Sequence, residues 1–356
     1  MLGHHQKRNP DVGAADEPSS ESAAVAADYD ARVREQQVPQ RVKVSLIATV
    51  KNEADHILPF LDSVARQTRK PDEFVVVDGG STDGTLEALQ AAEGLTLIEE
   101  PGANIAGGRN IAIAAAAHDI IAVTDGDCVL EPDWLERLIR EIDAGADVAM
   151  GAYRGLAGDF LETCMACANL PDLDRLDEAA FMPSARSVGF RREAMELVGG
   201  YPEWLDIGED MWVNHRWREL GLDMRLARDA VVWWRSGRPT LGNWHRYFSY
   251  ARGDAIAGMY PGRHTIRFAV YGGALFAWRS KSLLAKCLTI VGGFVYAAKP
   301  LRRAMARLAH PGDRAKAVLV VPVILAFLDS AKMAGYLSGL IARSRQALTS
   351  RLRRPL

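Results

Sequence analysis

Two acidic motifs in the sequence have the residue types needed to bind a cation or move a proton. Asp125-Gly126-Asp127 stands at the end of the apolar run 119–125, and Gly208-Glu209-Asp210 precedes a helical pattern at 211–220. Two carboxylates one residue apart at a strand end can share a divalent cation and the ribose or diphosphate of a nucleotide. Such hard oxygen ligands suit Mg²⁺ or Mn²⁺, which keep several waters and bind substrate phosphates. A solvated surface turn uses the same residues, so the surroundings decide between the two interpretations.

An earlier acid, Asp78, ends the apolar run 73–78 and is followed by the glycine-rich segment 79–85. Glycines let the backbone approach a ligand closely. Within this segment, Asp83-Gly84-Thr85 is more typical of a turn and a helix start than of a ligand site.

The elements that must position these acids follow from the hydrophobic pattern. Continuous apolar, β-branched runs at 42–50, 73–78, 95–100 and 119–125 alternate with helical patterns at 56–67, 86–92 and 104–117. This alternation predicts βαβ units and an α/β fold with a mostly parallel, doubly wound sheet. Ligands bind such sheets at the carboxyl ends of the strands, so the rule indicates 49–53, 78–83 and 125–127.

The charge of the 356-residue chain is divided unevenly, although its net value is only −2. The segment 262–356 has 17 Lys and Arg but only two acids, Asp313 and Asp329, while the rest of the chain has a charge of −17. The overall balance excludes a general nucleic-acid-coating protein, and we expect no nucleic-acid partner. An acidic body with a basic, apolar end suggests a soluble module joined to a part that meets an anionic surface.

The basic end contains three apolar runs, at 268–278, 283–298 and 317–342. The last spans 26 residues, which by length would cross a bilayer, yet it includes Asp329 and Lys332. We interpret the runs as membrane-associated helices that either span the bilayer or lie in its interface. A soluble helical subdomain is the alternative.

The chain is therefore divided into four predicted parts. They are a disordered tail at 1–40 with one helical turn near Asp28–Glu35, a catalytic body at 41–262, an apolar helical segment at 263–342 and a basic tail at 343–356. The first residues have no apolar run typical of a signal peptide, so we expect a cytoplasmic location. Cys164 and Cys167 form a single C-x-x-C without a second pair, which favours a buried helical face over a metal or redox site.

Longer stretches of the body resemble the family-2 glycosyltransferases, which have the GT-A fold. The resemblance covers about residues 42–254. It rests on KVSLIATVKNEADHILPFLDSVARQTRKPDEFVVVDGGSTDGT, AGGRNIAIAAA, TDGDCVLEPDWL, VGFRREAMELVGGYPE and GEDMWVNHRWRELG, in that family's order and spacing. It implies transfer of a sugar from a nucleoside diphosphate to an acceptor hydroxyl, with inversion at the anomeric carbon.

The resemblance also implies a nucleotide-sugar site. Thr49, Val50 and Glu53 would border the base and ribose, Asp78 would hydrogen-bond the base, and Asp125 would face the ribose. Arg109 would lie beside the nucleotide sugar and face a phosphate, or alternatively pair with a neighbouring Asp. The full set is Thr49, Val50, Glu53, Asp78, Gly79, Ser81, Gly108, Arg109, Asn110, Asp125, Gly126 and Arg238.

The same resemblance assigns the metal and the base. Asp127 would hold Mg²⁺ or Mn²⁺ on the diphosphate, with Asp125 and His245 as further candidate ligands. Asp210 would take the proton from the attacking hydroxyl, on the face opposite the leaving diphosphate, and Glu209 would orient the acceptor or assist. A carboxylate at a helix start is also a common cap.

The processive synthases have a Q-x-x-R-W string after the base, and none occurs in this sequence, so we expect the addition of a single sugar. Six of the eight tryptophans fall between Trp204 and Trp244, and we expect one or two of them near the acceptor and the others in the core. We therefore expect a non-processive, metal-dependent transferase of polysaccharide or glycolipid biosynthesis. We expect its donor to be a nucleoside-diphosphate sugar, with UDP as the nucleotide that the family uses most often. We expect its acceptor to be a lipid-linked molecule or a glycan at the cytoplasmic face of an anionic membrane. The competing hypothesis is a catalytically inactive GT-A protein that binds nucleotide sugar or serves as a scaffold.

Overall fold

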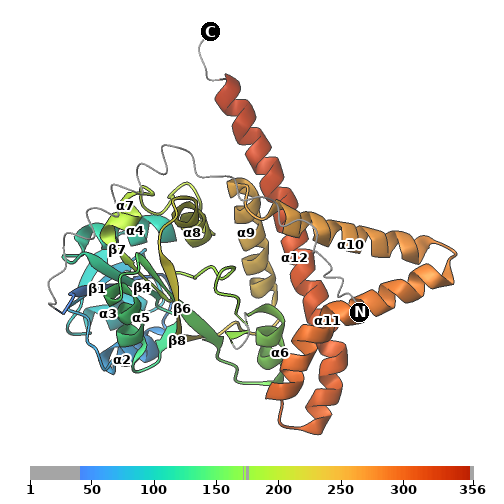
Figure 1. Cartoon of the computed structure of the whole chain (residues 1–356), viewed down its shortest axis with the longest axis horizontal. Coiled ribbons are helices and arrows are strands. Elements are labelled where there is room, and N and C mark those ends of the chain that lie inside the picture. The colour runs from blue at the N-terminus through green and yellow to red at the C-terminus, as the bar shows by residue number, and fades with distance from the viewer. Residues whose placement is uncertain (1–40, 171, 174–175, 353–356) are drawn as a thin grey trace, which may run out of the picture.

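The computed structural model describes residues 41–170, 172–173 and 176–352. An α/β lobe occupies one side of the molecule, and long C-terminal helices occupy the other (Figure 1). The predicted tail at 1–40, with its helical turn, lies outside the described residues.

An eight-stranded mixed sheet runs through the α/β lobe in the order β3-β2-β1-β4-β7-β6-β8-β5. Strands β3, β2, β1 and β4 are parallel to one another, and β6 is parallel to β8. Strand β7 is antiparallel to both β4 and β6, and β5 is antiparallel to β8. The strands are β1 (Val44–Val50), β2 (Glu73–Asp78), β3 (Thr96–Glu99), β4 (Ile120–Asp125), β5 (Cys128–Leu130), β6 (Val148–Gly155), β7 (Val188–Arg191) and β8 (Met224–Trp234). The α/β prediction is confirmed, and its parallel half is the half predicted from the apolar runs.

Helices cover both faces of this sheet. One face packs against α2 (Ile57–Ala65), α3 (Thr85–Gln90) and α5 (Trp134–Asp143). The other packs against α4 (Ile105–Ala115), α7 (Arg192–Glu196) and α8 (Glu209–Glu219). Strands buried on both faces read as continuous apolar runs, which is why β1, β2 and β4 were recognisable in the sequence.

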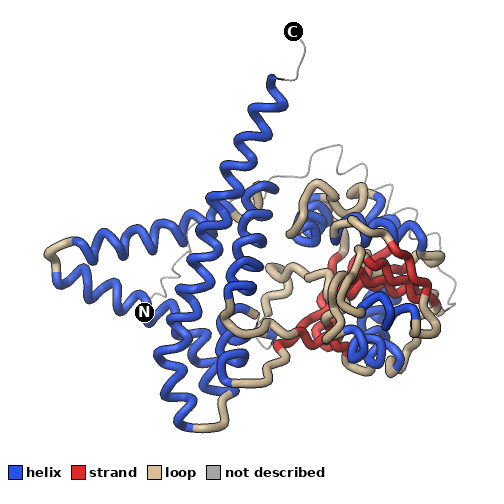
Figure 2. Tube along the Cα trace, turned by 180° about the vertical axis from the view of Figure 1, so that it is seen from behind, coloured by secondary structure: helices blue, strands red, loops and turns tan. Residues whose placement is uncertain are grey.

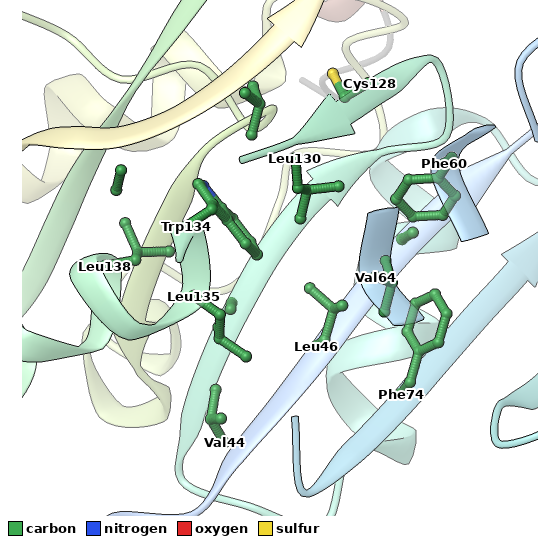
Figure 3. Packing of buried hydrophobic residues seen from close by; sticks show 14 of the residues in the cluster. Val44, Leu46, Phe60, Val64, Phe74, Cys128, Leu130, Trp134, Leu135 and Leu138 are labelled. Atoms are coloured by element: carbon green, nitrogen blue, oxygen red, sulfur yellow. The ribbon is translucent and has the colours of Figure 1, made fainter. Parts of the chain in front are cut away.

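The core on the first face is built around large side chains from α2, α5 and the central strands (Figure 3). Phe60, Leu46 and Trp134 have no exposed surface, and each buried side chain of this size contributes about 1.5–3 kcal/mol. The Trp134 indole N–H donates to Ser187 Oγ at 2.8 Å. This bond satisfies the one polar atom of the ring.

The C-terminal helices are α9 (Leu241–Ala257), α10 (Pro261–Arg279), α11 (Leu283–Arg307) and α12 (Pro311–Leu352), and α6 (Phe160–Asn169) lies between them and the sheet. Helix α12 crosses α9 at Gly335 and Gly339. A Cβ atom at these positions would lie 2.0 Å from the Phe248 carbonyl oxygen and 2.4 Å from that of Arg252. Glycine is therefore required for this contact, which joins α12 to α9.

Helices α10 and α11 form a hairpin that extends away from the α/β lobe (Figures 1 and 2). Its exposed large apolar side chains are Ile266, Val270, Leu275, Phe276, Trp278, Leu283, Leu284, Leu288, Ile290, Val291, Phe294, Val295 and Tyr296. Helix α11 and residues Pro311–Arg345 of α12 are both long and apolar enough to cross a membrane, by length and composition alone. The predicted apolar C-terminal helices are thus confirmed. The boundary predicted at 342/343 falls inside α12, which continues to Leu352.

Candidate active site

The loop after β1 is held in place by the glycine-rich loop after β2. The backbone N–H of Asn52 donates to Ser81 Oγ at 2.9 Å, and that of Glu53 donates to Thr85 Oγ1 at 2.7 Å. Asn52 has a φ of 58°, a left-handed conformation that Asn tolerates better than most residues. These bonds fix the backbone beside Val50, where the carboxyl ends of β1, β2 and β4 meet.

A cavity of about 450 Å³ opens at these strand ends. Its lining residues are Thr49, Val50, Lys51, Glu53, Val77, Gly79, Gly102, Ala103, Asn104, Ile105, Gly108, Asp125, Gly126, Asp127, Arg186, Arg246 and Tyr250. Gly126 is required here because a Cβ atom would lie 2.5 Å from Val50 Cγ1. We call this space the donor cavity, since seven of its lining residues were predicted to bind the nucleotide sugar and an eighth, Asp127, its metal.

Asp78 is placed differently from the predicted nucleotide contacts that line the donor cavity, and Ser81 is likewise absent from its lining. Its carboxylate is buried and accepts hydrogen bonds from the backbone N–H groups of Gly80 and Ser81, both at 2.9 Å, and from the Ser81 hydroxyl. It is not among the residues that line the donor cavity. In this structure Asp78 therefore organises the loop after β2, and its contact with a nucleotide base stays a prediction.

The two carboxylates of the Asp125-Gly126-Asp127 motif have different partners. Asp125 Oδ1 accepts from Arg109 Nη2 at 2.8 Å, whereas Asp127 Oδ2 accepts from the indole N–H of Trp234 at 2.7 Å. Burial, the nearby Asp127 and, more weakly, Asp125 raise the pKa of Glu53, which shows that three carboxylates share this edge of the cavity. Their mutual repulsion favours a bound cation.

Arg109 is a buried bridge between the two acidic motifs. Its guanidinium pairs with Asp125 at the end of β4 and with Glu209 at the start of α8. This is the ion-pair alternative left open by the sequence. Burial, and then the charge of Asp210, raise the pKa of Glu209, while Arg109 opposes the shift. The next residue, Asn110, binds the backbone of Tyr201 on both sides, so it positions that loop and lies outside both cavities.

A second cavity, of about 660 Å³, contains the Asp210 carboxylate. Helix α8 begins at Glu209, one residue after Gly208 with its φ of 88°, so both acids lie in its first turn. The backbone N–H groups of Met211 and Ala185 donate to Asp210 at 2.8 and 3.2 Å. A helix N-terminus stabilises a negative charge at this position. We call this space the acceptor cavity, because Asp210 was predicted to take the proton of the acceptor hydroxyl.

The two cavities are adjacent. They share Ile105, Asp125, Arg186 and Tyr250 as lining residues. Asp127 therefore borders the donor cavity and Asp210 the acceptor cavity, with Asp125 and Arg186 between them. A carboxylate base on one side of a reacting centre and a diphosphate site on the other is the arrangement that a single displacement needs.

Arg186 was not among the site residues predicted from the sequence. Its guanidinium lies 4.2 Å from the centre of the Trp234 ring, its Nη1 donates to Ser184 Oγ at 3.0 Å, and its Nε is 3.7 Å from Asp125 Oδ2. The residue is partly buried and lines both cavities. No sequence pattern indicates this role, because the position of Arg186 depends on its contact with Trp234, which lies on the distant strand β8.

Two other predicted residues lie outside both cavities. Arg238 donates from Nε to Asp159 Oδ2 at 2.6 Å and is exposed. His245 is exposed on α9, with its ring edge-on to Trp244 at 5.4 Å. Across residues 41–170, 172–173 and 176–352, no three His, Cys, Asp or Glu side chains are grouped as a metal-binding set. A cation at Asp127 would thus take most of its ligands from substrate and water, as Mg²⁺ commonly does.

The cysteine pair has the structural role that the sequence favoured, whereas the prediction that the remaining tryptophans lie in the core is wrong for Trp204. Cys164 and Cys167 are buried free thiols on α6, packed with residues of α11 and α12, and burial raises the pKa of Cys164 to about 11. Trp234 is the tryptophan that lines a cavity, whereas Trp217 is core and Trp204 is exposed.

The C-terminal helices contribute to the acceptor cavity, which the sequence analysis did not anticipate. Arg263, His264 and Arg267 from α10 and Lys332 from α12 all line it. The basic end of the chain, 262–356, is thus part of the candidate site.

The sequence of the α/β lobe is similar to that of known glycosyltransferases. The sequence profile described as Glycosyl transferase family 2 matches residues 45–195, from β1 to α7. Over this part, which is less than half of the chain, the sequence is similar to the family-2 glycosyltransferases. The matched region contains the donor-cavity carboxylates, and the segment with Asp210 lies beyond it.

Two curated glycosyltransferases are similar over a longer part of the chain. Glycosyltransferase AglE of Haloferax volcanii is 29% identical over 198 residues, which cover 53% of this chain and 65% of that protein. The O-antigen chain rhamnosyltransferase RfbN of Salmonella typhimurium is 23% identical over 222 residues, which cover 58% of this chain and 71% of that protein. The chain thus matches less than two thirds of the length of AglE.

Among solved structures, the mannosyltransferase PcManGT from Pyrobaculum calidifontis, in complex with GDP-Man and Mn²⁺, aligns with 94% of this chain and 97% of its own. The TM-score of this alignment is 0.49, and the sequences are 21% identical.

Proposed function

We propose that the protein transfers a single sugar, with inversion, from a nucleoside-diphosphate sugar to a hydroxyl of a lipid-linked or glycan acceptor. UDP is the first nucleotide to test. The main support for this proposal is that the two cavities are adjacent. Asp127 lines the donor cavity and Asp210 lines the acceptor cavity. The similarity to an O-antigen chain rhamnosyltransferase supports a glycan acceptor.

In this proposal the chain's own residues bind the donor and move one proton. The donor cavity receives the nucleotide, and Arg186, Arg246 and Lys51 supply positive charge along it. Asp210 accepts the proton of the attacking hydroxyl, while its two backbone N–H contacts hold the carboxylate in place. Arg109 fixes Glu209 and Asp125 on either side, so Glu209 serves to position rather than to exchange protons.

Asp127 is the residue that would hold Mg²⁺ or Mn²⁺, with Asp125 and Glu53 nearby. Its carboxylate is only partly buried, and one of its oxygens is oriented by Trp234. When bound, a divalent cation neutralises the diphosphate as it departs.

We also propose that the protein works at a membrane surface, with the α10–α11 hairpin in contact with the cytoplasmic leaflet. The support is its row of exposed apolar side chains and the basic residues Arg279, Lys281 and Lys286 at its tip. A protein that stays wholly in solution without detergent and ignores anionic vesicles would contradict this part.

The test of the transferase is donor turnover by purified full-length protein with Mn²⁺, screened across nucleotide sugars in a membrane lipid extract and followed by mass spectrometry. We expect metal-dependent transfer by the wild type and a loss of several orders of magnitude in Asp210→Asn, with donor binding retained. Glu219→Gln, at the exposed far end of the same helix, is the matched control. Absence of turnover with every donor would favour the inactive scaffold.

A further inference from the structure

Trp204 is an exposed tryptophan on the loop between α7 and α8. Its side chain is 58% exposed, and its ring is edge-on to that of Trp212 on α8, with centroids 6.3 Å apart. Trp212 in turn packs against the core on that face of the sheet. Neither ring lines a cavity, and the proposed reaction uses neither. A single exposed apolar side chain is ordinary on a protein surface, so its surroundings decide whether Trp204 can bind a ligand.

The loop holds Trp204 in a fixed position. Asn104 Nδ2 donates to the Glu203 carbonyl oxygen at 2.7 Å, and Asn110 Nδ2 donates to Glu203 Oε1 at 2.9 Å. On the other side of Trp204, the Leu205 side chain is buried. An exposed ring between two anchored neighbours loses little conformational freedom when a ligand binds, which lowers the entropic cost of binding.

The same loop forms part of the rim of the acceptor cavity. Asp206, Ile207 and Gly208 line this cavity, and Gly208 directly precedes the turn of α8 that contains Asp210. Trp204 and Asp206 are two residues apart, so their Cα atoms lie within about 7 Å of each other. A ligand that extends from Asp210 past Asp206 can therefore contact the Trp204 ring.

Asp206 offers a carboxylate at this rim. It is exposed, and among the residues that the structure describes it makes no hydrogen bond or ion pair. An ionised carboxylate only accepts hydrogen bonds, so it suits a ligand with hydroxyl groups. Glu203, on the other side of Trp204, is a second exposed acid. Two acids beside the ring disfavour contact with an anionic bilayer, whose surface attracts basic segments.

We propose that Trp204 and Asp206 form an outer subsite that binds a sugar ring of the acceptor, next to the unit whose hydroxyl reacts at Asp210. This deepens the proposed transferase function and rests on it. A pyranose ring has a face of C–H groups that can stack on an indole, and hydroxyl groups at its edge that can donate to a carboxylate. An aliphatic chain would use the indole but leave the carboxylate without a partner. The acceptor is thus an oligosaccharide, in which the reacting sugar is followed by another sugar.

The test measures binding of the tetrasaccharides of glucose, mannose, galactose and rhamnose to full-length protein with UDP and Mn²⁺, by isothermal titration. The protein is kept in a polyoxyethylene detergent, which contains no sugar, and the methyl glycoside of each sugar is the single-ring comparison. We expect at least one tetrasaccharide to bind about tenfold or more tightly than its methyl glycoside, because it occupies the cavity and the outer subsite together. Equal affinity of tetrasaccharide and methyl glycoside for every sugar, or no binding by any, would overturn the outer subsite.

Three variants locate the subsite. Trp204→Ala should weaken binding of the tightest tetrasaccharide about fivefold or more and leave the methyl glycoside unaffected, since only the outer ring is lost. Trp204→Tyr keeps an aromatic face and should restore most of the affinity. Trp278→Ala removes an indole that is 61% exposed on α10 and should leave saccharide binding unchanged. Equal weakening in Trp204→Ala and Trp278→Ala would overturn the subsite.

Vesicles of phosphatidylglycerol and phosphatidylcholine separate this subsite from a membrane contact. Trp278→Ala should weaken vesicle binding, because Trp278 stands among the exposed apolar side chains of the hairpin, and Trp204→Ala should not. Weaker vesicle binding by Trp204→Ala, with saccharide binding unchanged, would assign Trp204 to the membrane surface and overturn the proposal. Saccharide binding needs no turnover, so failure of the transferase in the donor screen is a separate result.

Discussion

Trp234 orients Asp127, the residue proposed to hold the metal ion. Its indole N–H donates to Asp127 Oδ2 at 2.7 Å, and its ring face carries Arg186 at 4.2 Å. Replacing it with Phe keeps an aromatic face for Arg186 and removes the shorter of two hydrogen bonds to Asp127, the other being from Cys128 Sγ at 3.6 Å. Trp234 is thus a positioning residue, and its loss should weaken cation binding while the fold persists.

The expected magnitude follows from that single bond. A hydrogen bond to a charged acceptor contributes about 1.5–3 kcal/mol, and each 1.4 kcal/mol is about a factor of ten. We therefore expect Trp234→Phe to raise the Mn²⁺ concentration for half-maximal donor turnover about 10- to 100-fold. This agrees with the usual cost of losing a partner that orients a metal ligand. Turnover at saturating Mn²⁺ should fall much less.

The chain offers a matched control one residue away. The Trp233 indole N–H donates to Glu131 Oε1 at 2.6 Å, and Trp233 lines neither cavity. Trp233→Phe removes the same kind of bond and should leave the Mn²⁺ dependence unchanged. Equal Mn²⁺ dependence in wild type, Trp233→Phe and Trp234→Phe would refute the assignment of Asp127 as the metal ligand.

Two further predictions concern the C-terminal helices. Gly335→Val should lower the melting temperature by several degrees and expose α12 to proteolysis, since the new side chain would overlap the Phe248 carbonyl. The control is Gly293→Val, because a Cβ atom at Gly293 would have no atom within 4 Å. Identical melting curves for the two variants would contradict the packing of α12 on α9. Cys287 is exposed on α11, whereas the other three thiols are buried, so a water-soluble maleimide should label about one thiol in detergent-free solution. Anionic vesicles should slow that labelling at least tenfold, and an unchanged rate would place the hairpin outside the membrane.

The first half of the sheet was predictable because its strands are buried on both faces. Continuous β-branched runs gave β1, β2 and β4 almost to the residue, and the helices between them have clear patterns. The second half was not predicted, because β7 pairs antiparallel between β4 and β6, and short antiparallel strands leave little periodicity. Pairing of this kind depends on contacts between residues far apart in the chain.

The candidate site residues differ in how closely their contacts in the structure match the roles predicted from the sequence. Gly126 lines the donor cavity, where only the absence of a side chain allows the close approach to Val50. Asp78 accepts hydrogen bonds from its own loop, and Arg109 pairs with two carboxylates, one of them in the ion pair that the sequence left open as an alternative. Sequence shows that an acid or a base is present, while its partner is chosen by the elements packed around it.

The sequence by itself determined an acidic α/β body with carboxylates at its strand ends and a basic, apolar end of the chain. These are local properties, written in periodicity, composition and motif spacing. Only the tertiary structure decided that the basic end also forms a wall of the acceptor cavity, because that depends on α12 crossing α9 at two glycines. It likewise brought Arg186 and Trp234 to Asp125 and Asp127 from distant segments. Long-range packing, which no local pattern encodes, converts two separate charge clusters into a single site.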